Sequence, residues 1–348
     1  MVENHVPQIL SLFPCEVNAH VEHAREHLRA WVHHTGLVHK ESSKERFDRA
    51  DFGWFAAMVY PTADAARLAL LADWFGWLFL VDDQLDDGEV GRRPEQMMEV
   101  FTEIHAVMTS PDLGQAIARR PGVPVVVSSL ADLWRRTADG ASPRWQRRFA
   151  EHLVDCLTTA ATWEAGNRVT GTVPDEATYI INRRHIGAIY VCMDLIEIVA
   201  ELDVPTEIYD SPQFIATLDA ACNVVCWTND VYSLEKERAR GEVHNLVYIT
   251  EQRQGLSQEE AMARVCTAIS AETELFLTKE QELLRAFDRH SATLSPYLAG
   301  MRTWISGNLA WSRRTERYRS SDHADGTPLR DYLEPELMGV PLDRHGRR

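Results

Sequence analysis

The chain has 348 residues, of which 45% are hydrophobic and 25% charged, a composition typical of a globular protein with a sizeable buried core. Its formal net charge of −16 excludes nucleic acid and anionic membrane surfaces as expected main partners. The six cysteines are scattered without a CxxC pair, which favours a reducing compartment. With no signal-like N-terminus and no apolar run of bilayer length, these features predict a cytoplasmic protein without stable membrane association.

The predicted secondary structure is helical along most of the chain. Proline, glycine and capping residues indicate helices over residues 20–35, 42–60, 62–87, 94–108, 124–137, 143–167, 174–202, 212–240, from 257 onward and 296–320. The β-branched triplet Val125–Val127 is too short to indicate a strand, and we find no internal repeat and no linker-like change in composition. We therefore predict one all-α domain over residues 21–320, after an irregular segment (1–20) and before a polar tail (321–348) that forms a flap or is disordered.

The first unusual pattern is an apolar stretch that ends in aspartates, LADWFGWLFLVDDQLDD at residues 71–87. A helix C-terminus carries partial negative charge, so carboxylates there destabilise the helix, and their i,i+4 spacing adds repulsion. Such acids indicate a bound hard divalent cation, which prefers oxygen ligands, although a solvated helix end is the alternative. Phe75 and Phe79 lie seven and three residues before Asp82, so they share its helix face. They are expected to line an apolar cavity or to belong to the ordinary core.

A second stretch, IATLDAACNVVCWTNDVYSLEKERARGE, repeats the pattern of an apolar run followed by oxygen-bearing side chains. Asn229, Ser233 and Glu237 are spaced at i, i+4 and i+8, so they form one stripe along a helix. An amide oxygen, a hydroxyl and a carboxylate suit magnesium, which favours substrate phosphates as co-ligands. A plain polar helix face explains the triplet alone equally well. Two such helices facing each other across a bundle would hold a metal cluster at the mouth of an apolar cavity.

Cationic side chains occur where a phosphate group would need them. Arg183 lies in YIINRRHIGAIY, Lys236 lies within the second stretch, and Arg317 with Tyr318 belongs to a basic cluster predicted on the last helix. Arginine binds phosphate oxygens through two parallel hydrogen bonds, and lysine acts as a point charge. Each cation alone is expected on the surface, and only their combination indicates an anionic ligand.

These motifs resemble those of the bacterial class I terpene synthases (terpene cyclases). Residues 82–86, DDQLD, are similar to the aspartate-rich DDxxD motif, and residues 229–237, NDVYSLEKE, match NDxxSxxxE in every required position. Arg183, 46 residues before Asn229, is similar to the diphosphate-sensing arginine of the family. The resemblance extends from about residue 13 to residue 318.

The resemblance implies a role for each motif residue. The implied metal ligands are Asp82, Asp86, Asn229, Ser233 and Glu237, although the neighbouring Asp87 leaves open which acid of that pair contacts metal. The implied diphosphate-binding residues are Arg183, Lys236, Arg317 and Tyr318. Asp83 is expected to bind Arg183 on closure, Gly187 is the effector residue at a helix break, and Ile186 is the linker. The implied cavity residues are Phe75, Phe79 and Trp311.

The resemblance also implies the fold and the reaction. The expected fold is a single α-helical bundle around a central apolar cavity, and the expected cofactor is Mg²⁺, with three ions. The expected enzyme is a carbon–oxygen lyase that ionises a linear isoprenoid diphosphate, most commonly farnesyl diphosphate. It would cyclise the carbocation to a sesquiterpene hydrocarbon or alcohol and release diphosphate. A homodimer is among the expected assemblies, because members of the family often form dimers.

Other functions remain open at this stage. A diterpene synthase would use geranylgeranyl diphosphate, and geranyl diphosphate is a third substrate. A chain-elongating isoprenyl transferase should carry a second DDxxD motif where this chain has Asn229, Ser233 and Glu237. A proton-initiated class II cyclase needs DxDD, which does not occur in the sequence. A non-enzymatic helical interaction protein would leave both metal motifs and the spacing from Arg183 to Asn229 unexplained.

Overall fold

The structure, a computed structural model, describes residues 9–87, 94–318 and 333–339. These residues form helices and loops and contain no β-strand, which confirms the predicted all-α class. They group into two compact units. The α4 unit comprises residues 20–56, 64–87, 94–166 and 333–339, and the α13 unit comprises residues 9–19, 57–63 and 167–318. The domain boundaries expected near residues 20 and 320 stay a prediction.

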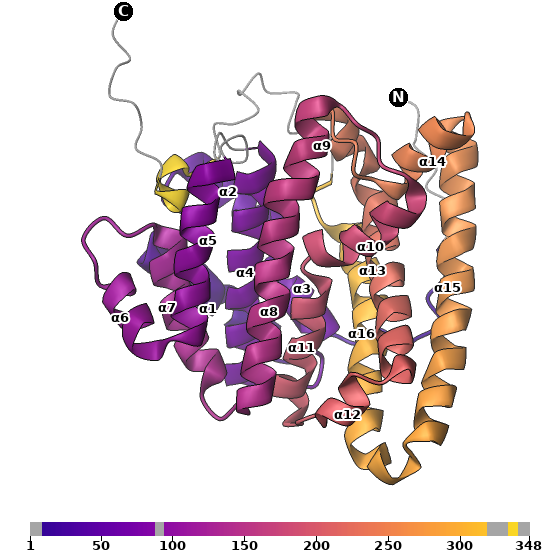
Figure 1. Ribbon diagram of the computed structural model, residues 1–348, viewed down its shortest axis with the longest axis horizontal. Helices are drawn as coiled ribbons and strands as arrows, with labels where there is room; N and C mark the ends of the chain where they lie inside the picture. Colours follow the sequence, from indigo (N-terminus) through magenta and orange to yellow (C-terminus); the bar gives the residue numbers. More distant parts are fainter. Residues whose placement is uncertain (1–8, 88–93, 319–332, 340–348) are drawn as a thin grey trace, which may run out of the picture. The chain divides into compact units, whose positions relative to one another are not determined.

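The α4 unit contains the helices of the first half of the chain (Figure 1). They are α1 (Val21–Thr35), α2 (Glu41–Ala50), most of α3 (Phe52–Val59), α4 (Ala65–Asp87), α5 (Pro94–Thr109), α6 (Pro111–Ala118), α7 (Val125–Ala138), α8 (Pro143–Thr159), the π-helix η2 (Ala160–Glu164), the start of α9 (Ala165–Thr170) and the short 3-10 helix η5 (Pro335–Met338). Helix α4 packs against α1 and α7, and α5 packs against α6, α7 and α8.

Helix α4 lies inside its unit because it is apolar on nearly every face. Trp74 and Trp77 are fully buried, and each places its indole N–H on an internal acceptor. The indole of Trp74 donates to the hydroxyl of Thr137 at 2.8 Å, and that of Trp77 donates to the carbonyl of Val126 at 3.0 Å. Both acceptors belong to α7, so the two tryptophans fix α4 against that helix without leaving a buried donor unsatisfied.

The α13 unit contains the helices of the second half (Figure 1). They are the end of α9, then α10 (Glu176–Ile186), α11 (Ile189–Ala200), α12 (Thr206–Tyr209), α13 (Pro212–Ala239), α14 (Leu246–Gln254), α15 (Gln258–Ala286), the 3-10 helix η3 (Asp288–His290) and α16 (Ser291–Arg314). Helix α13 packs along α15 and α16, and α14 packs against α13 and α15. The helix starts predicted near residues 212 and 257 are confirmed. Ser211 and Ser257 cap α13 and α15 by accepting hydrogen bonds from the first turns, and Ser257 forms a capping box with Glu260.

Several predicted helix boundaries are wrong. The single helix expected over 42–60 is two helices, because Asp51 adopts a left-handed conformation (φ 53°) between α2 and α3. The last helix begins at Ser291 and contains Pro296, instead of starting there. It ends at Arg314, where Thr315 becomes extended, so Arg317 and Tyr318 follow the helix instead of lying on it.

Only residues 333–339 of the predicted tail lie among the described residues, and they are packed. Leu337 and Met338 of η5 are buried, and the Glu334 carboxylate accepts hydrogen bonds from the backbone N–H groups of His39 and Lys40, each at 2.8 Å. Since Lys40 is the residue that precedes α2, this carboxylate satisfies donors near a helix start. The rest of the predicted flap, 321–332 and 340–348, lies outside the described residues.

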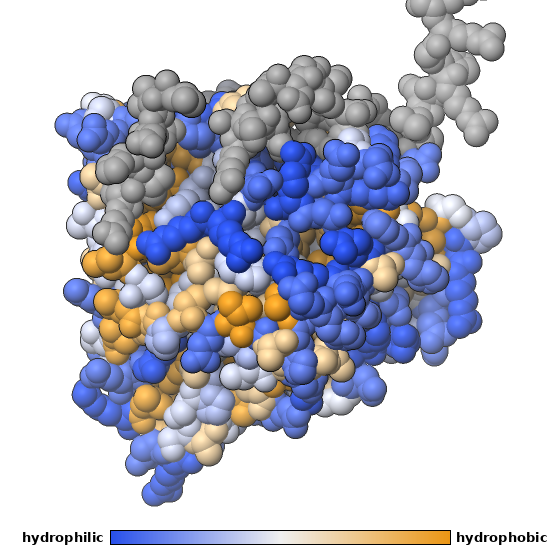
Figure 2. All heavy atoms as spheres, turned by 180° about the vertical axis from the view of Figure 1, so that it is seen from behind, coloured by the Kyte–Doolittle hydropathy of each residue, from blue (hydrophilic) through white to orange (hydrophobic). Residues whose placement is uncertain are grey.

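The surface is largely polar. Figure 2 shows one face, on which hydrophilic side chains cover much of the area and apolar side chains lie between them. The exposed large apolar side chains are Leu10, Leu12, Val17, Met98, Leu113, Val169, Ile181, Ile215 and Leu275. Among the described residues, no helix is both long enough and apolar enough to cross a bilayer.

Candidate functional site

The first predicted motif forms the C-terminal end of α4. Asp82 and Asp86 are partly exposed and lie one turn apart on the same face, whereas the Asp83 side chain is buried. Helix α4 runs to Asp87, so the aspartates belong to the helix end that the sequence predicted. The contact expected between Asp83 and Arg183 stays a prediction.

Phe75 and Phe79 precede these aspartates on α4 and pack against aromatic residues of α3. The ring of Phe79 stacks on that of Phe52 with centroids 4.4 Å apart, and the Phe75 ring lies 5.0 Å from that of Phe55. Phe75 is fully buried and Phe79 is partly exposed. Both are thus held by ring contacts below the acidic turn, and their role in a substrate cavity stays a prediction.

The second motif lies on α13, where Asn229, Ser233 and Glu237 form the expected stripe. Ser233 is buried, and its hydroxyl donates to the backbone carbonyl of Asn229 at 2.8 Å. Asn229 and Glu237 are partly exposed. The structure therefore bears out the shared helix face of the triplet, which depends only on helical spacing.

The side chain of Arg183, the predicted diphosphate sensor, contacts the predicted metal ligand Asn229 directly. Its Nη2 donates to Asn229 Oδ1 at 2.9 Å, and its Nε donates to Asp230 Oδ1 at 2.9 Å. The Asn229 amide in turn donates from Nδ2 to the hydroxyl of Tyr318 at 2.5 Å. The structure thus brings together the predicted diphosphate sensor Arg183, the predicted metal ligand Asn229 and the predicted diphosphate-binding Tyr318.

Asp230 is a buried hub that the sequence analysis did not assign. Its carboxylate is fully buried and contacts the Tyr179 hydroxyl at 2.8 Å, Arg183 Nε at 2.9 Å and the backbone N–H of Leu246 at 3.0 Å. A buried charge needs such paired and hydrogen-bonded surroundings. The position next to Asn229 within NDVYS was the available signal, but the three partners come from α10 and α14 and are distant in sequence.

Glu237 is the carboxylate of the stripe and lies in the last turn of α13. Burial and the charge of Asp230 raise its pKa to about 7, while hydrogen bonds with Asn245 and Ser233 and the charge of Arg183 act in the opposite direction. A carboxyl group whose pKa is raised by burial and by a neighbouring charge is typical of a functional site. Lys236, the neighbouring predicted diphosphate ligand, is partly exposed in the same turn.

The predicted helix break lies where the sequence placed it, but its geometry differs. Helix α10 ends at Ile186, which is partly exposed, and α11 begins at Ile189. Gly187 has φ −76°, and the left-handed residue is Ala188 with φ 51°. Gly187 lies close to Arg183: a Cβ there would lie 2.7 Å from Arg183 Nη1 and 3.0 Å from the Arg183 carbonyl oxygen. The glycine therefore makes room for the arginine.

A network of polar side chains connects α10 and α11, the helices on the two sides of this break. Arg184, at the end of α10, donates from Nε to the Tyr190 hydroxyl of α11 at 2.7 Å. Both side chains also contact Asp219 of α13, with Arg184 Nη2 at 3.1 Å and the Tyr190 hydroxyl at 2.7 Å from its carboxylate oxygens. These contacts connect α10 and α11 across Ala188, whose positive φ is unfavourable for a residue with a Cβ.

The remaining predicted residues come from the C-terminal part of the α13 unit. Trp311 is fully buried in α16, with its ring 5.5 Å from that of Tyr318 in an edge-to-face arrangement. Arg317 is buried, and its backbone N–H donates to the Thr315 hydroxyl at 3.2 Å. Trp311 thus packs against the predicted diphosphate-binding tyrosine, and its predicted contact with a hydrocarbon substrate is untested.

The α13 stripe has the donor chemistry of a magnesium site. Asn229 Oδ1 and the Ser233 hydroxyl oxygen can each accept from more than one partner, and the Glu237 carboxylate has a second oxygen besides the one bonded by Asn245. All three carry hard oxygen donors on one helix face, the donor type that Mg²⁺ prefers. The residues therefore fit the ion that the sequence predicts.

Comparisons with known proteins agree with these features. The family model described as "Terpene synthase family 2, C-terminal metal binding" matches residues 73–274, more than half of the chain. The (+)-T-muurolol synthase ((2E,6E)-farnesyl diphosphate cyclizing) of Roseiflexus castenholzii is 32% identical over 91% of this chain and 95% of its own length. The pentalenene synthase of Streptomyces avermitilis is 31% identical over 96% of this chain and 97% of its own.

A solved structure extends the likeness to three dimensions. The linalool/nerolidol synthase from Streptomyces clavuligerus, in complex with 2-fluorogeranyl diphosphate, has a TM-score of 0.77 and 28% identity over 86% of this chain and all of its own. Family model, relatives and fold agree, and the chain belongs to the terpene synthase family. The metal-binding region named by the family model includes both α4 and α13 motifs.

Proposed function

We propose that the protein is a carbon–oxygen lyase that converts farnesyl diphosphate to a cyclic sesquiterpene hydrocarbon or alcohol. The linked side chains of Arg183, Asn229 and Tyr318 are the observation that carries this proposal. The Asn229 amide, whose oxygen can ligate a metal ion, is hydrogen-bonded both to a guanidinium that can bind an anion and to a phenol. The substrate class is supported by relatives such as the T-muurolol synthase, whose name states that it cyclises farnesyl diphosphate.

The proposed site uses Mg²⁺, with three ions, held on α13 by Asn229, Ser233 and Glu237. For Asp82 and Asp86 of α4 the assignment as ligands rests on the DDxxD-like motif. Bound Mg²⁺ would stabilise the negative charge that develops on the leaving diphosphate. Asn229 would exchange its contact with Arg183 for the metal, because the guanidinium is then drawn to the diphosphate oxygens.

The protein side chains supply the rest of the reaction. Arg183, Lys236, Arg317 and Tyr318 would bind the diphosphate as the allylic C–O bond breaks and the electron pair leaves with oxygen. The carbocation would then cyclise against aromatic faces, for which Phe79, Phe75 and Trp311 are the candidates, each cation–π contact contributing about 0.5–2 kcal/mol. Loss of a proton from the carbocation gives a hydrocarbon, and capture of water followed by loss of a proton gives an alcohol.

The decisive experiment is incubation of the full-length protein and Mg²⁺ with geranyl, farnesyl or geranylgeranyl diphosphate, followed by gas chromatography–mass spectrometry and assay of released diphosphate. We expect a cyclic C15 product from farnesyl diphosphate and no turnover in excess chelator. A C10 product would agree with the geranyl analogue bound by the structural relative, and a C20 product would indicate a diterpene synthase. A longer diphosphate, formed when isopentenyl diphosphate is added as co-substrate, would indicate a chain-elongating transferase.

Variants of α13 test the assignment of residues. Asn229→Ala and Glu237→Ala should reduce kcat by at least about a hundredfold while circular dichroism remains unchanged, because each removes a ligand from a partly exposed helix face. Glu235→Gln is the matched control, since Glu235 lies on the same helix but is exposed and bonded to Gln258. Unchanged turnover in both alanine variants would refute the proposal.

A further inference from the structure

Glu237 lies at the C-terminal end of α13, where the helix by itself does not keep a side chain in one orientation. It lies two residues before Ala239, the last residue of α13, in the last turn, where helices fray. Its carbonyl oxygen accepts hydrogen bonds from the backbone N–H groups of Arg240 and Glu242, both at 3.0 Å. The loop that follows the helix, residues 241–245, therefore folds back onto the residue that carries the proposed ligand.

Asn245 ends this loop and reaches the Glu237 side chain directly. It is 1% exposed, and its Nδ2 donates to Glu237 Oε2 at 2.8 Å and to the backbone carbonyl of Asp230 at 2.7 Å. Its Oδ1 accepts from the N–H groups of Val247 and Tyr248, so Asn245 is also the N-cap of α14. One side chain thus connects the start of α14 with the end of α13.

The direction of the Asn245 amide follows from its partners. Both groups near Nδ2 are acceptors, a carboxylate and a carbonyl, and both groups near Oδ1 are N–H donors. A flipped amide would oppose like groups at all four contacts, so only one orientation satisfies them. Asn245 can therefore hold Glu237 Oε2 in a single direction, which leaves Oε1 as the oxygen not engaged by this amide.

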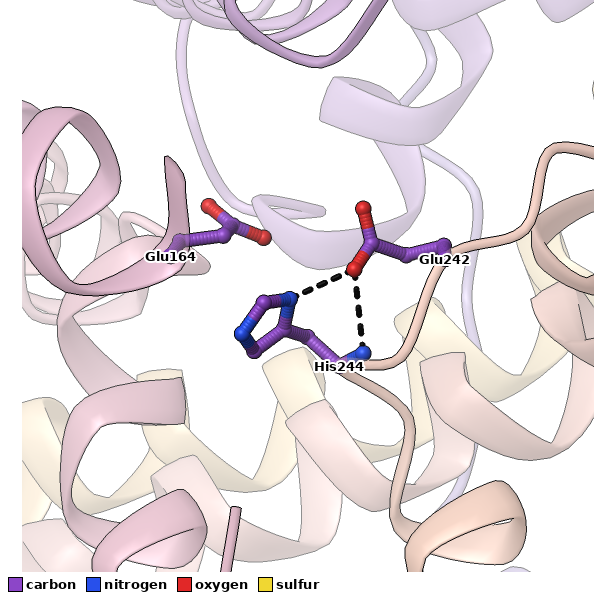
Figure 3. A group of neighbouring side chains, drawn as sticks. All are labelled: Glu164, Glu242 and His244. Atoms are coloured by element: carbon purple, nitrogen blue, oxygen red, sulfur yellow. Dashed lines mark hydrogen bonds and ion pairs between the residues drawn. The ribbon is translucent and has the colours of Figure 1, made fainter. Parts of the chain in front are cut away.

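The loop itself is anchored by a partly buried ion pair with α9. Figure 3 shows Glu242 Oε1 contacting both the Nδ1 atom and the backbone N–H of His244, at 2.5 and 3.0 Å. The other carboxylate oxygen of Glu242 accepts from Arg168 Nε at 2.8 Å and Nη2 at 2.7 Å. Burial opposes ionisation of Glu242, but the contacts with His244 and Arg168 outweigh it and lower its pKa.

His244 completes the anchor and adjoins Asn245 in the chain. Its side chain is 1% exposed, and Nε2 lies 3.1 Å from Asn167 Nδ2. With the amide as donor, Nε2 accepts, so Nδ1 carries the hydrogen that points to Glu242. The His244 carbonyl lies 3.1 Å from the Tyr179 hydroxyl, which also contacts Asp230. The residue before Asn245 is thus fixed on both its side chain and its backbone.

We infer that Asn245 is a positioning residue that holds the Glu237 carboxylate in the orientation that ligates Mg²⁺. The inference rests on the proposed function, in which Glu237 is a ligand. Partners that orient a metal ligand raise metal affinity because the ligand is already ordered before binding, and their loss typically weakens affinity by about 10–100-fold. Without the Asn245 amide, Glu237 would have to be ordered when the ion binds.

The test is isothermal titration calorimetry, in which the full-length protein is titrated with Mg²⁺ in the presence of inorganic diphosphate to measure the Kd for Mg²⁺. Asn245→Ser retains a side-chain oxygen that can cap α14, and serine is as good an N-cap as asparagine. The variant lacks the amide N–H₂ group that donates to Glu237 while the oxygen caps the helix. We expect an unchanged circular dichroism spectrum and a Kd for Mg²⁺ raised by about 10-fold or more. Excess Mg²⁺ should restore kcat in this variant.

Three further variants separate the outcomes. Gln258→Ser is the matched control, because Gln258 gives an equivalent amide bond to Glu235 at 2.7 Å, and its Mg²⁺ affinity should equal that of the wild type. Asn245→Thr replaces Asn245→Ser if the serine variant does not fold, since threonine also caps a helix. Glu237→Gln should lose Mg²⁺ affinity without rescue. Lost affinity in Glu237→Gln with unchanged affinity in Asn245→Ser overturns the inference alone, whereas unchanged affinity in Glu237→Gln overturns the proposed ligand.

Discussion

Asp73 and Asp230 are both fully buried aspartates within long helices, one in each unit, yet their surroundings differ. Asp230 uses both carboxylate oxygens, which contact Tyr179, Arg183 and the N–H of Leu246. Asp73 directs one oxygen to His27 Nε2 at 3.0 Å and Arg136 Nη1 at 2.9 Å, and its Oδ1 has no hydrogen-bond partner among the described residues. A fully satisfied buried charge orders its neighbours, whereas a partly satisfied one mainly adds a cost of burial.

The neighbours of each aspartate show the consequence. Arg183 is 13% exposed in its side chain and also contacts Asn229, so Asp230 orders a residue of the proposed site. His27 and Arg136 are 38% and 25% exposed, so solvent can replace the Asp73 carboxylate as their partner. From this comparison we expect Asp230 to support function and Asp73 to support only local packing.

Substitution of Asp230 should have the largest effect. Asp230→Asn would place an amide N–H₂ against donors and leave the buried Arg183 without its anionic partner. Breaking a buried ion pair in this way costs about 3–5 kcal/mol in the free energy of unfolding. We expect this loss in urea denaturation, together with lost release of diphosphate. Glu235→Gln on the same helix is the control, and a stable Asp230→Asn variant with normal activity would remove the proposed distinction between the two aspartates.

Substitution of Asp73 should have a smaller effect. Burial raises the Asp73 pKa, although the hydrogen bond from His27 and the charges of His27 and Arg136 oppose the shift. A neutral Asp73→Asn side chain avoids the cost of the buried charge, so its loss of stability should be below about 1.5 kcal/mol, with unchanged kcat and KM. Urea denaturation and steady-state kinetics check this expectation. A loss as large as that of Asp230→Asn would show that both sites are equally dependent on their charge.

The pH dependence of the Asp73 site should be the smallest effect. The hydrogen bond with Asp73 raises the pKa of His27, against burial and the charge of Arg136, and Asp132 adds to the increase. The folded-state pKa is thus above the unfolded value of about 6.5, so the stabilisation is fully present below that value and is lost as the pH rises through the folded-state pKa. Unfolding free energies of wild type and His27→Gln should differ more at pH 6 than at pH 9. An equal difference at both values would contradict a charged His27 in this pair.

The sequence predicted the motifs better than the boundaries between helices. The capping patterns at Ser211 and Ser257 were correct because they depend on residues within one turn. The interruption at Asp51 was missed because its left-handed conformation carries no local signal, although its carboxylate contacts Arg25 of α1 at 2.8 Å. That long-range ion pair is a property of the folded chain.

In the candidate site, too, local patterns were predictable from the sequence and contacts between helices were not. The stripe on α13 followed from the spacing of Asn229, Ser233 and Glu237, since the helix repeat alone aligns residues four apart. The contact of Arg183 with Asn229 required the packing of α10 against α13. The same contact holds the Arg183 guanidinium beside Gly187, where a Cβ would have little room. Asn245 was missed altogether, because its role depends on a loop that folds back on the preceding helix.

The sequence by itself determined the all-α class, the family and the side chains with metal-ligand and phosphate-binding chemistry. Helical spacing and residue type are local properties, and they are fixed before the chain folds. The tertiary structure decided which of those side chains are held and by what: Asp230 as a hub, Gly187 as space for Arg183, and Asn245 as the partner of Glu237. These depend on how α10 and the loop before α14 pack onto α13, because burial then leaves each polar group with a small set of partners.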